Sequence, residues 1–128
     1  MSAARRTIQR IKIMDYLKNT KAHPTAEKIH KKIKKQIPTI SLATVYRNLN
    51  VLRDAGKIVK IEYENESHYD ANLKFHQHFI CRKCKKISDI HNENITKYAI
   101  KNIDYEKFMP EKVKIIYYGI CKKCKGGV

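Results

Sequence analysis

Apolar residues recur at helical spacing in the first part of the chain. Within residues 5–19, Ile8, Ile11 and Met14 are three positions apart and Leu17 continues the stripe, which predicts an amphipathic helix with these residues inward. A second helix is predicted after Thr25, a favoured N-cap residue. Its apolar residues are four positions apart and it ends before a proline: Ile29, Ile33, Ile37 and Pro38.

A third helix is predicted from Ser41, which can cap it, to a point just before Gly56, a common helix terminator. Its inward stripe is formed by Leu42, Val45, Leu49 and Leu52. Alternating apolar and polar residues at 59–63, a polar turn at 64–67 and a short strand at 68–70 then predict a β-hairpin. Three helices and a hairpin in this order are typical of a winged helix-turn-helix.

The pattern changes after residue 70. Two short strands are predicted at 79–81 and 86–90, a helix through Ile95, Ala99 and Ile103, and a last strand within 113–121. The expected fold class is therefore α+β, with a winged-helix DNA-binding domain at residues 1–70 and a small α/β domain at residues 71–128. The second domain is too small to be stable without further support.

Charge supports this division. The chain of 128 residues has a net charge of +16. Residues 1–60 contain 15 Lys or Arg against 3 acidic residues, a net +12, while residues 61–128 contain 13 against 9, a net +4. Such an excess attracts polyanions, so we expect a nucleic-acid surface in the first domain. The alternative is a lysine bias that only improves solubility.

Other patterns exclude a membrane protein. No apolar run approaches the roughly 20 residues of a membrane helix, and the N-terminus lacks the apolar segment of a signal peptide. We therefore expect a soluble cytoplasmic protein.

The third helix has an outward face suited to reading DNA. Arginine pairs with guanine or phosphate, asparagine with adenine, and threonine contacts the backbone or a thymine methyl group. With the apolar stripe inward, Ala43 and Asp54 also point outward and Tyr46 lies on the flank. The alternative is an ordinary solvated helix face. The candidate DNA-binding residues are Thr44, Tyr46, Arg47 and Asn50.

Two Cys-x-x-Cys pairs carry the strongest chemical signal. Cys81 with Cys84 and Cys121 with Cys124 can place four thiolates around one ion, as in structural zinc sites. A closed set of four thiolates leaves no open position for catalysis, so no enzyme is expected. The alternative is a redox-active pair, but no thioredoxin-like βαβ pattern precedes either pair.

A second cluster contains nitrogen and oxygen donors. His76 and His78 share one face of a strand and can chelate one ion. Exposed histidines, or histidines satisfied by hydrogen bonds, are the alternative interpretation.

Four motifs together resemble the ferric uptake regulator family across nearly the whole chain. They are His23-Pro24-Thr25-Ala26, Ser41-Leu42-Ala43-Thr44-Val45-Tyr46-Arg47-Asn48-Leu49, His76-Gln77-His78-Phe79-Ile80-Cys81-x-x-Cys84, and Tyr118-Gly119-x-Cys121-x-x-Cys124. One segment departs from the family pattern: Thr7-Ile8-Gln9-Arg10 stands where Thr-Pro-Gln-Arg is usual.

The resemblance implies a homodimer, formed by the zinc-stapled second domain, that binds a palindromic double-stranded DNA operator when a regulatory metal is bound. The implied regulatory ligands are His23, Asp70, His76, His78 and Asp89. Three imidazoles and two carboxylates suit Fe(II) or Mn(II). His68 and His91 match no ligand position of the family.

Asp70 and Asp89 stand where iron-sensing relatives usually carry Glu, so the set is most similar to the peroxide-sensing branch. That branch implies a repressor released from DNA when Fe(II) and peroxide add oxygen to a ligating histidine, His23 or His76, with peroxide as the only small-molecule signal. The alternatives are a sensor of iron, manganese or zinc levels in the same family, a zinc-ribbon nucleic-acid protein without a regulatory metal, and a redox enzyme using Cys-x-x-Cys.

Overall fold

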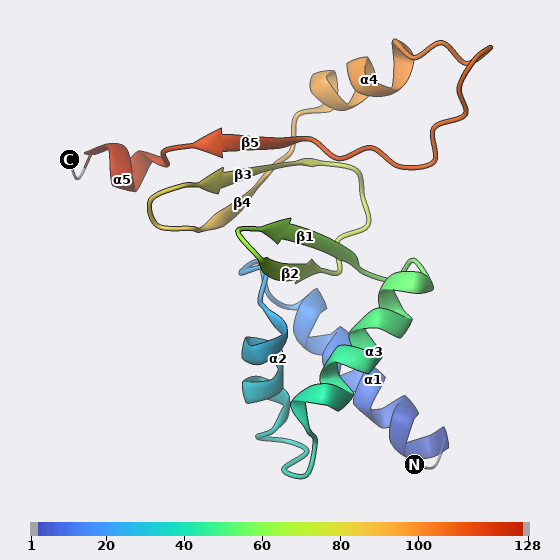
Figure 1. Ribbon diagram of the computed structural model, residues 1–128, viewed down its shortest axis with the longest axis vertical. Coiled ribbons are helices and arrows are strands. Elements are labelled where there is room, and N and C mark those ends of the chain that lie inside the picture. Colours follow the sequence, from blue (N-terminus) through green and yellow to red (C-terminus); the bar gives the residue numbers. More distant parts are fainter. Residues whose placement is uncertain (1–2, 127–128) are drawn as a thin grey trace. The chain divides into compact units, whose positions relative to one another are not determined.

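The computed structural model describes residues 3–126. The chain forms two compact units, residues 1–73 and residues 74–128, each built from its own helices and strands (Figure 1). The expected α+β class is confirmed. None of the helices in the described part of the chain is long and apolar enough to cross a bilayer.

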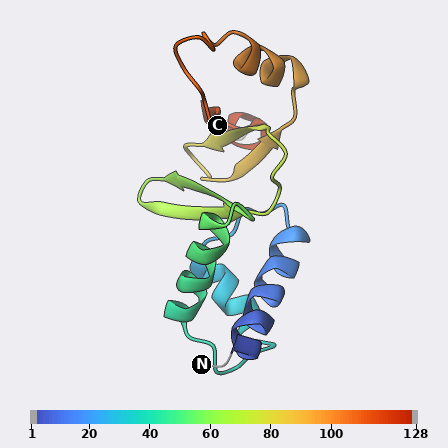
Figure 2. The same ribbon diagram turned by 90° about the vertical axis from the view of Figure 1, so that its right-hand side faces the viewer.

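The first unit contains three helices, α1 (Ala3–Lys18), α2 (Ala26–Ile33) and α3 (Leu42–Asp54), as Figures 1 and 2 show. Both predicted N-caps are confirmed: the Thr25 hydroxyl accepts from the Lys28 N–H at 3.4 Å and the Ser41 hydroxyl from the Thr44 N–H at 3.1 Å. After α3, Gly56 adopts φ of 72°, the left-handed conformation that ends many helices. Helix α2 ends at Ile33, and turns carry the chain to a partly buried Ile37.

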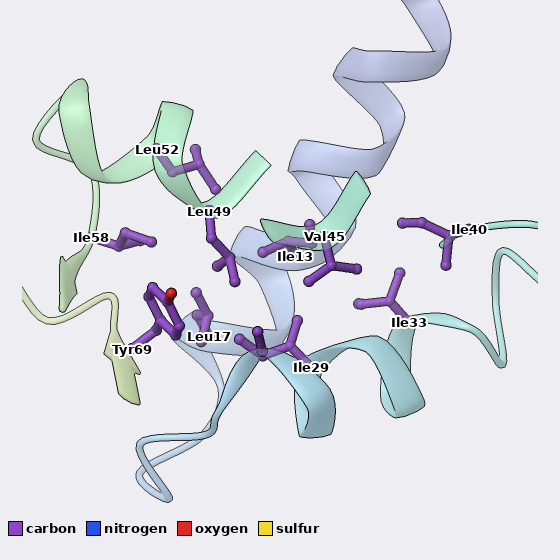
Figure 3. Close-up of a cluster of buried hydrophobic side chains, with 11 residues drawn as sticks. Ile13, Leu17, Ile29, Ile33, Ile40, Val45, Leu49, Leu52, Ile58 and Tyr69 are labelled. Atoms are coloured by element: carbon purple, nitrogen blue, oxygen red, sulfur yellow. The ribbon is translucent and has the colours of Figure 1, made fainter. Parts of the chain in front are cut away.

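The hairpin of the first unit consists of β1 (Val59–Tyr63) and β2 (Glu66–Asp70), paired antiparallel. Glu64 and Asn65 form the turn with φ of 49° and 65°, the positive values that a two-residue hairpin turn requires. The hairpin closes one end of the helical core, and Tyr69 points into it beside Leu49 and Leu17 (Figure 3). The predicted three helices and hairpin are therefore present, in the predicted order.

The predicted inward face of α1 was wrong in part. Ile13 and Leu17 are buried, but Ile8 is 53 % exposed and Ile11 is 51 % exposed. An α-helix turns about 100° per residue, so residues 8 and 17 are about 180° apart and cannot share one face. Gln9, four residues before Ile13, is buried instead. Its side-chain oxygen Oε1 accepts a hydrogen bond from Asn48 Nδ2 of α3 at 3.3 Å, which gives this buried oxygen a partner.

The observed orientation of α1 predicts which of its isoleucines contribute to stability. Ile13→Ala is expected to lower the free energy of unfolding by about 2–5 kcal/mol, because it removes a fully buried side chain from the core shown in Figure 3. Ile8→Ala, the matched control on the same helix, is expected to change it by less than about 0.5 kcal/mol. Urea titrations of the two variants measure both values, and equal losses would contradict the observed orientation of α1.

The second unit contains β3 (Gln77–Cys81), β4 (Ile87–Ile90), α4 (Glu93–Lys101), β5 (Ile116–Gly119) and α5 (Lys122–Gly126). Its sheet has the order β4-β3-β5, with β3 antiparallel to β4 and parallel to β5. The two early strands and the helix were predicted. The last strand is shorter than the predicted run of 113–121, and α5 was not predicted.

The apolar core of the second unit is thin. Among its described residues, the buried apolar side chains are Ile80, Cys81 and Ile87, and α4 has no buried residue. Large apolar side chains instead lie at the surface, including Tyr98, Phe108 and Met109, which are 71 %, 63 % and 89 % exposed. A core of this size stabilises a fold weakly, so the unit requires another source of stability.

Candidate metal centres and nucleic-acid interface

The four cysteines converge within the second unit. One sulfur from each of Cys81, Cys84, Cys121 and Cys124 lies within 4.8 Å of every other. A zinc–sulfur bond of about 2.3 Å gives tetrahedron edges of about 3.8 Å. The Sγ atoms of Cys84 and Cys121, from opposite ends of the unit's sequence, are 3.8 Å apart. The donor set therefore has the chemistry and the spacing of a closed Zn²⁺ site.

Backbone N–H groups polarise this cluster. Those of Cys121 and Cys84 point at the Cys81 sulfur, at 3.5 and 3.4 Å, and lower the pKa of that thiol to about 5. The Cys124 N–H lowers the pKa of Cys121, while the hydrogen bond with Cys121 raises the pKa of Cys124 to about 12. Thiolates so close together oppose each other's ionisation, and a divalent cation removes that opposition.

A second donor set in the same unit consists of His76, His78 and Asp89. His78 on β3 and Asp89 on β4 are directly opposite in the antiparallel register. The Nε2 atoms of His76 and His78 lie 3.0 and 3.3 Å from the same oxygen, Oδ1 of Asp89. The two rings are 4.4 Å apart between centroids. The predicted pair of histidines is therefore brought together, with a carboxylate between them.

The hydrogen bond of His76 to the backbone shows which of its ring nitrogens is available to bind a metal ion. Its Nδ1 lies 2.6 Å from the carbonyl oxygen of Lys74, which only accepts hydrogen bonds, so Nδ1 carries a proton. Nε2 is then the ring nitrogen that can offer a lone pair to a metal ion, and it faces Asp89 Oδ1 at 3.0 Å. A carbonyl oxygen behind the other ring nitrogen is a common outer partner of histidines that bind metal.

A third donor pair lies within the first unit. His23 Nε2 is 3.3 Å from Asp70 Oδ2, and both side chains are buried. His23 has φ of 51°, an uncommon conformation for a non-glycine residue. Backbone strain of this kind often accompanies functional positions. The segment is held against β2, because His68 Nδ1 donates to the His23 carbonyl at 2.7 Å and the Tyr69 N–H donates to the Pro24 carbonyl at 3.0 Å.

The predicted outward orientation of the candidate DNA-binding residues of α3 agrees with the structure except at Thr44. Tyr46, Arg47 and Asn50 are exposed. Thr44 was predicted to point outward, but it is 6 % exposed, because its hydroxyl oxygen accepts from Ser41 at 2.9 Å and from Arg47 Nη2 at 3.1 Å. Thr44 is therefore buried with its hydroxyl bound to the guanidinium of Arg47, and its own contact with DNA stays a prediction.

A comparison with known proteins identifies the family. The sequence profile of the Ferric uptake regulator family matches residues 2–118. The chain belongs to this family. Regulators of the ferric uptake regulator family bind DNA operators and act as dimers.

Individual relatives narrow the comparison within the ferric uptake regulator family. The chain is 36 % identical over 125 residues to the peroxide-responsive repressor PerR of Staphylococcus epidermidis, covering 97 % of this chain and 83 % of that protein. It is 35 % identical to the peroxide operon regulator of Bacillus subtilis, with 96 % and 86 % covered. The solved structure of the Campylobacter jejuni peroxide stress regulator is similar over 94 % of this chain and 92 % of that one, with a TM-score of 0.82 and 34 % identity.

Two histidines of this family member have contacts that the sequence interpretation missed. His68 donates a hydrogen bond to the backbone carbonyl of His23. His91 stacks on His76 with ring centroids 4.9 Å apart and an angle of 27° between the planes. Neither matches a ligand position of the family, so the sequence indicated no role for them. Alternation on the hairpin could have placed His68 near β1, but the partner of His91 depends on the course of the chain after β4.

Proposed function

We propose that this chain is a metal-dependent DNA-binding transcriptional repressor that responds to peroxide. The observation that carries the proposal is the convergence of His76 and His78 on Asp89, a nitrogen and oxygen donor set separate from the four thiolates. Softer thiolates select zinc, whereas imidazole and carboxylate ligands suit Fe(II) and Mn(II). The similarity to peroxide-responsive repressors over nearly the whole chain supports the same function.

The two parts of the chain have different roles in this proposal. Residues 1–70 form the DNA-binding domain, and its α3 enters the major groove of the operator. The proposed contacts are made by Thr44, Tyr46, Arg47 and Asn50. Residues 71–128 form the dimerisation domain, whose exposed apolar side chains, among them Tyr98 and Phe108, pack against a second copy. Because the partner is DNA and the response is transcriptional, the protein acts in the cytoplasm and is not an enzyme.

We assign one structural Zn²⁺ to the four cysteines and one regulatory Fe²⁺ or Mn²⁺ to the remaining donors. The proposed regulatory ligands are His23, Asp70, His76, His78 and Asp89. Neither donor set is complete alone: the first unit supplies one imidazole and one carboxylate, the second supplies two imidazoles and one carboxylate. An ion that requires both sets stabilises one arrangement of the two units over others, and this differential binding is what a metal-dependent repressor needs.

The peroxide response follows from the same ligands. Fe²⁺ held by these residues would activate peroxide. In the balanced reaction, one peroxide oxygen is transferred to a ligating imidazole, which loses two electrons, and the other oxygen leaves as water. His23 and His76 are the proposed targets. The Lys74 carbonyl holds the His76 ring in place, and His68 of β2 holds the backbone of His23. An oxidised ring is a poorer ligand, so the ion and then the operator are released.

Metal-dependent operator binding tests this proposal. Replacing His76 and His78 together by alanine is expected to remove the response of operator affinity to Mn²⁺, while zinc content remains at one ion per chain. Replacing His91 by phenylalanine is the control, because it retains a ring against His76 but removes both ring nitrogens. Fluorescence anisotropy with added Mn²⁺ measures the response. If the double variant responded like the wild type, the regulatory site would not include these histidines.

A further inference from the structure

One carboxylate stands apart in the basic first unit. Glu27 is the only acidic residue between Asp15 and Asp54, a stretch that contains nine Lys or Arg residues. It is exposed in the first turn of α2, and its Oε1 accepts a hydrogen bond of 2.8 Å from the Tyr46 hydroxyl of α3. The lone negative charge of this region is therefore in contact with a residue of the proposed reading face.

The proton in this hydrogen bond belongs to the tyrosine. The backbone N–H of Glu27, followed by the Tyr46 hydroxyl, lowers the pKa of the Glu27 carboxyl. The hydrogen bond to Glu27 raises the pKa of Tyr46. Glu27 is thus a carboxylate, which only accepts, and Tyr46 must be the donor. A phenol has a single O–H, so the Tyr46 hydroxyl has no second proton to donate to DNA.

Because its proton is hydrogen-bonded to Glu27, the Tyr46 hydroxyl can interact with only some of the bases. In the major groove, guanine N7 and O6, adenine N7 and thymine O4 accept hydrogen bonds, whereas adenine N6 and cytosine N4 donate them and thymine carries a methyl group. A tyrosine without an available proton can accept from the amino groups or pack against the methyl group. It cannot donate to guanine, to thymine O4 or to a phosphate. Without Glu27, the same hydroxyl can donate to all of these.

We propose that Glu27 is a specificity-determining residue, which sets the base preference of α3 by holding the hydroxyl proton of Tyr46. This inference rests on the proposed function, because it requires that Tyr46 faces operator bases. The carboxylate has a second, non-specific effect: it repels phosphates of any duplex over a distance of about one Debye length. The two effects have different signatures, since repulsion changes affinity for all DNA and the held proton changes only the discrimination between sequences.

The test compares two duplexes of equal length. One is the sequence most enriched from a randomised pool by the Mn²⁺-loaded wild-type chain, and the other is an unselected sequence. Glu27→Ala, which removes both the charge and the acceptor of the Tyr46 proton, is expected to raise affinity for the unselected duplex about two- to fivefold, because one repulsive charge is lost. It is expected to reduce the ratio of selected to unselected affinity about fivefold to tenfold. A repeated selection with Glu27→Ala is expected to show relaxed preference at one symmetric position in each half-site.

Matched variants separate the two effects. Asp15→Asn removes the same charge from an exposed position on α1 and is expected to leave the ratio unchanged. In a Tyr46→Phe background, Glu27→Ala is expected to produce no further change in the ratio, because no hydroxyl proton is present. Thermal unfolding and zinc content of each variant verify that the fold is intact. The selectivity readout does not respond to a purely structural role of Glu27, which would weaken binding to both duplexes together.

Two outcomes overturn the inference in distinguishable ways. If Tyr46→Ala and Arg47→Ala weaken binding to the selected duplex while Glu27→Ala only reproduces the effect of Asp15→Asn, then Glu27 has no role in specificity and the proposed reading face stands. If neither Tyr46→Ala nor Arg47→Ala affects the selected duplex, the reading face itself is wrong, and the role of Glu27 is rejected with it.

Discussion

Replacing Cys81 by serine is expected to release the zinc ion and unfold the second unit. Cys81 is buried, and its sulfur accepts two backbone hydrogen bonds, from Cys84 and Cys121. These bonds hold the two Cys-x-x-Cys segments together. Binding of a structural zinc ion contributes on the order of 10–16 kcal/mol to folding. The thin apolar core of residues 74–128 cannot replace a contribution of that size.

The measurements are zinc content, far-UV circular dichroism and the mass of the assembly in solution. The variant is expected to lose the zinc, most of the signal from the second unit and the dimer, while the first unit keeps its own core of Ile13, Leu49 and their neighbours. Lys83→Ala, between the two cysteines of the first pair, is the control and is expected to keep the zinc. A zinc-free variant that still dimerises would show that the four cysteines do not stabilise this unit.

Exposure of the iron-loaded chain to peroxide is expected to add one oxygen atom to a peptide containing His23 or His76. Operator affinity is then expected to fall to the level of non-specific binding, a loss of at least about 10³-fold. The manganese-loaded chain is expected to keep both its mass and its affinity, because Mn²⁺ does not readily reduce peroxide. Peptide mass spectrometry and anisotropy on the same samples, prepared without oxygen, measure both effects.

The alternatives give different results in this experiment. Retained operator binding by the iron form after mild peroxide treatment would indicate a sensor of metal level with the same fold. Oxygen added only to cysteine or methionine peptides would reject the proposed role of the histidines. His91, which stacks on His76, is a useful internal reference, because an oxidant that diffuses freely in solution would reach this exposed ring as well.

Local patterns predicted much of the first unit correctly. N-caps at Thr25 and Ser41, the terminating Gly56 and the alternation in β1 depend on residues close in sequence, and each appears as expected. The prediction of the buried face of α1 was wrong in part, because that face depends on contacts with the other helices. Isoleucines at positions 8 and 11 suggested a buried apolar stripe. In the structure, Asn48 of α3 donates a hydrogen bond to Gln9, so the polar Gln9 lies on the buried face instead.

The second unit was harder to predict because its elements are short and its core is small. The β-branched and aromatic run at 113–121 indicated one long strand, but only Ile116–Gly119 pair with β3, and the chain turns into α5 at Lys122. Pairing in parallel with a strand some forty residues earlier is a non-local choice, and no pattern within the run marks where it begins or ends.

The sequence by itself determined the order of the helices and strands, the basic character of the first sixty residues and the two pairs of cysteines, because periodicity, charge and ligand spacing are properties of neighbouring residues. Only the tertiary structure decided that His76 presents Nε2 to Asp89, that the Thr44 hydroxyl is bound to Arg47, and that Tyr46 donates its proton to Glu27. The physical reason is that each of these depends on the direction of a hydrogen bond. That direction is set when partners, in two of the three cases distant in sequence, are brought to within about 3 Å of each other.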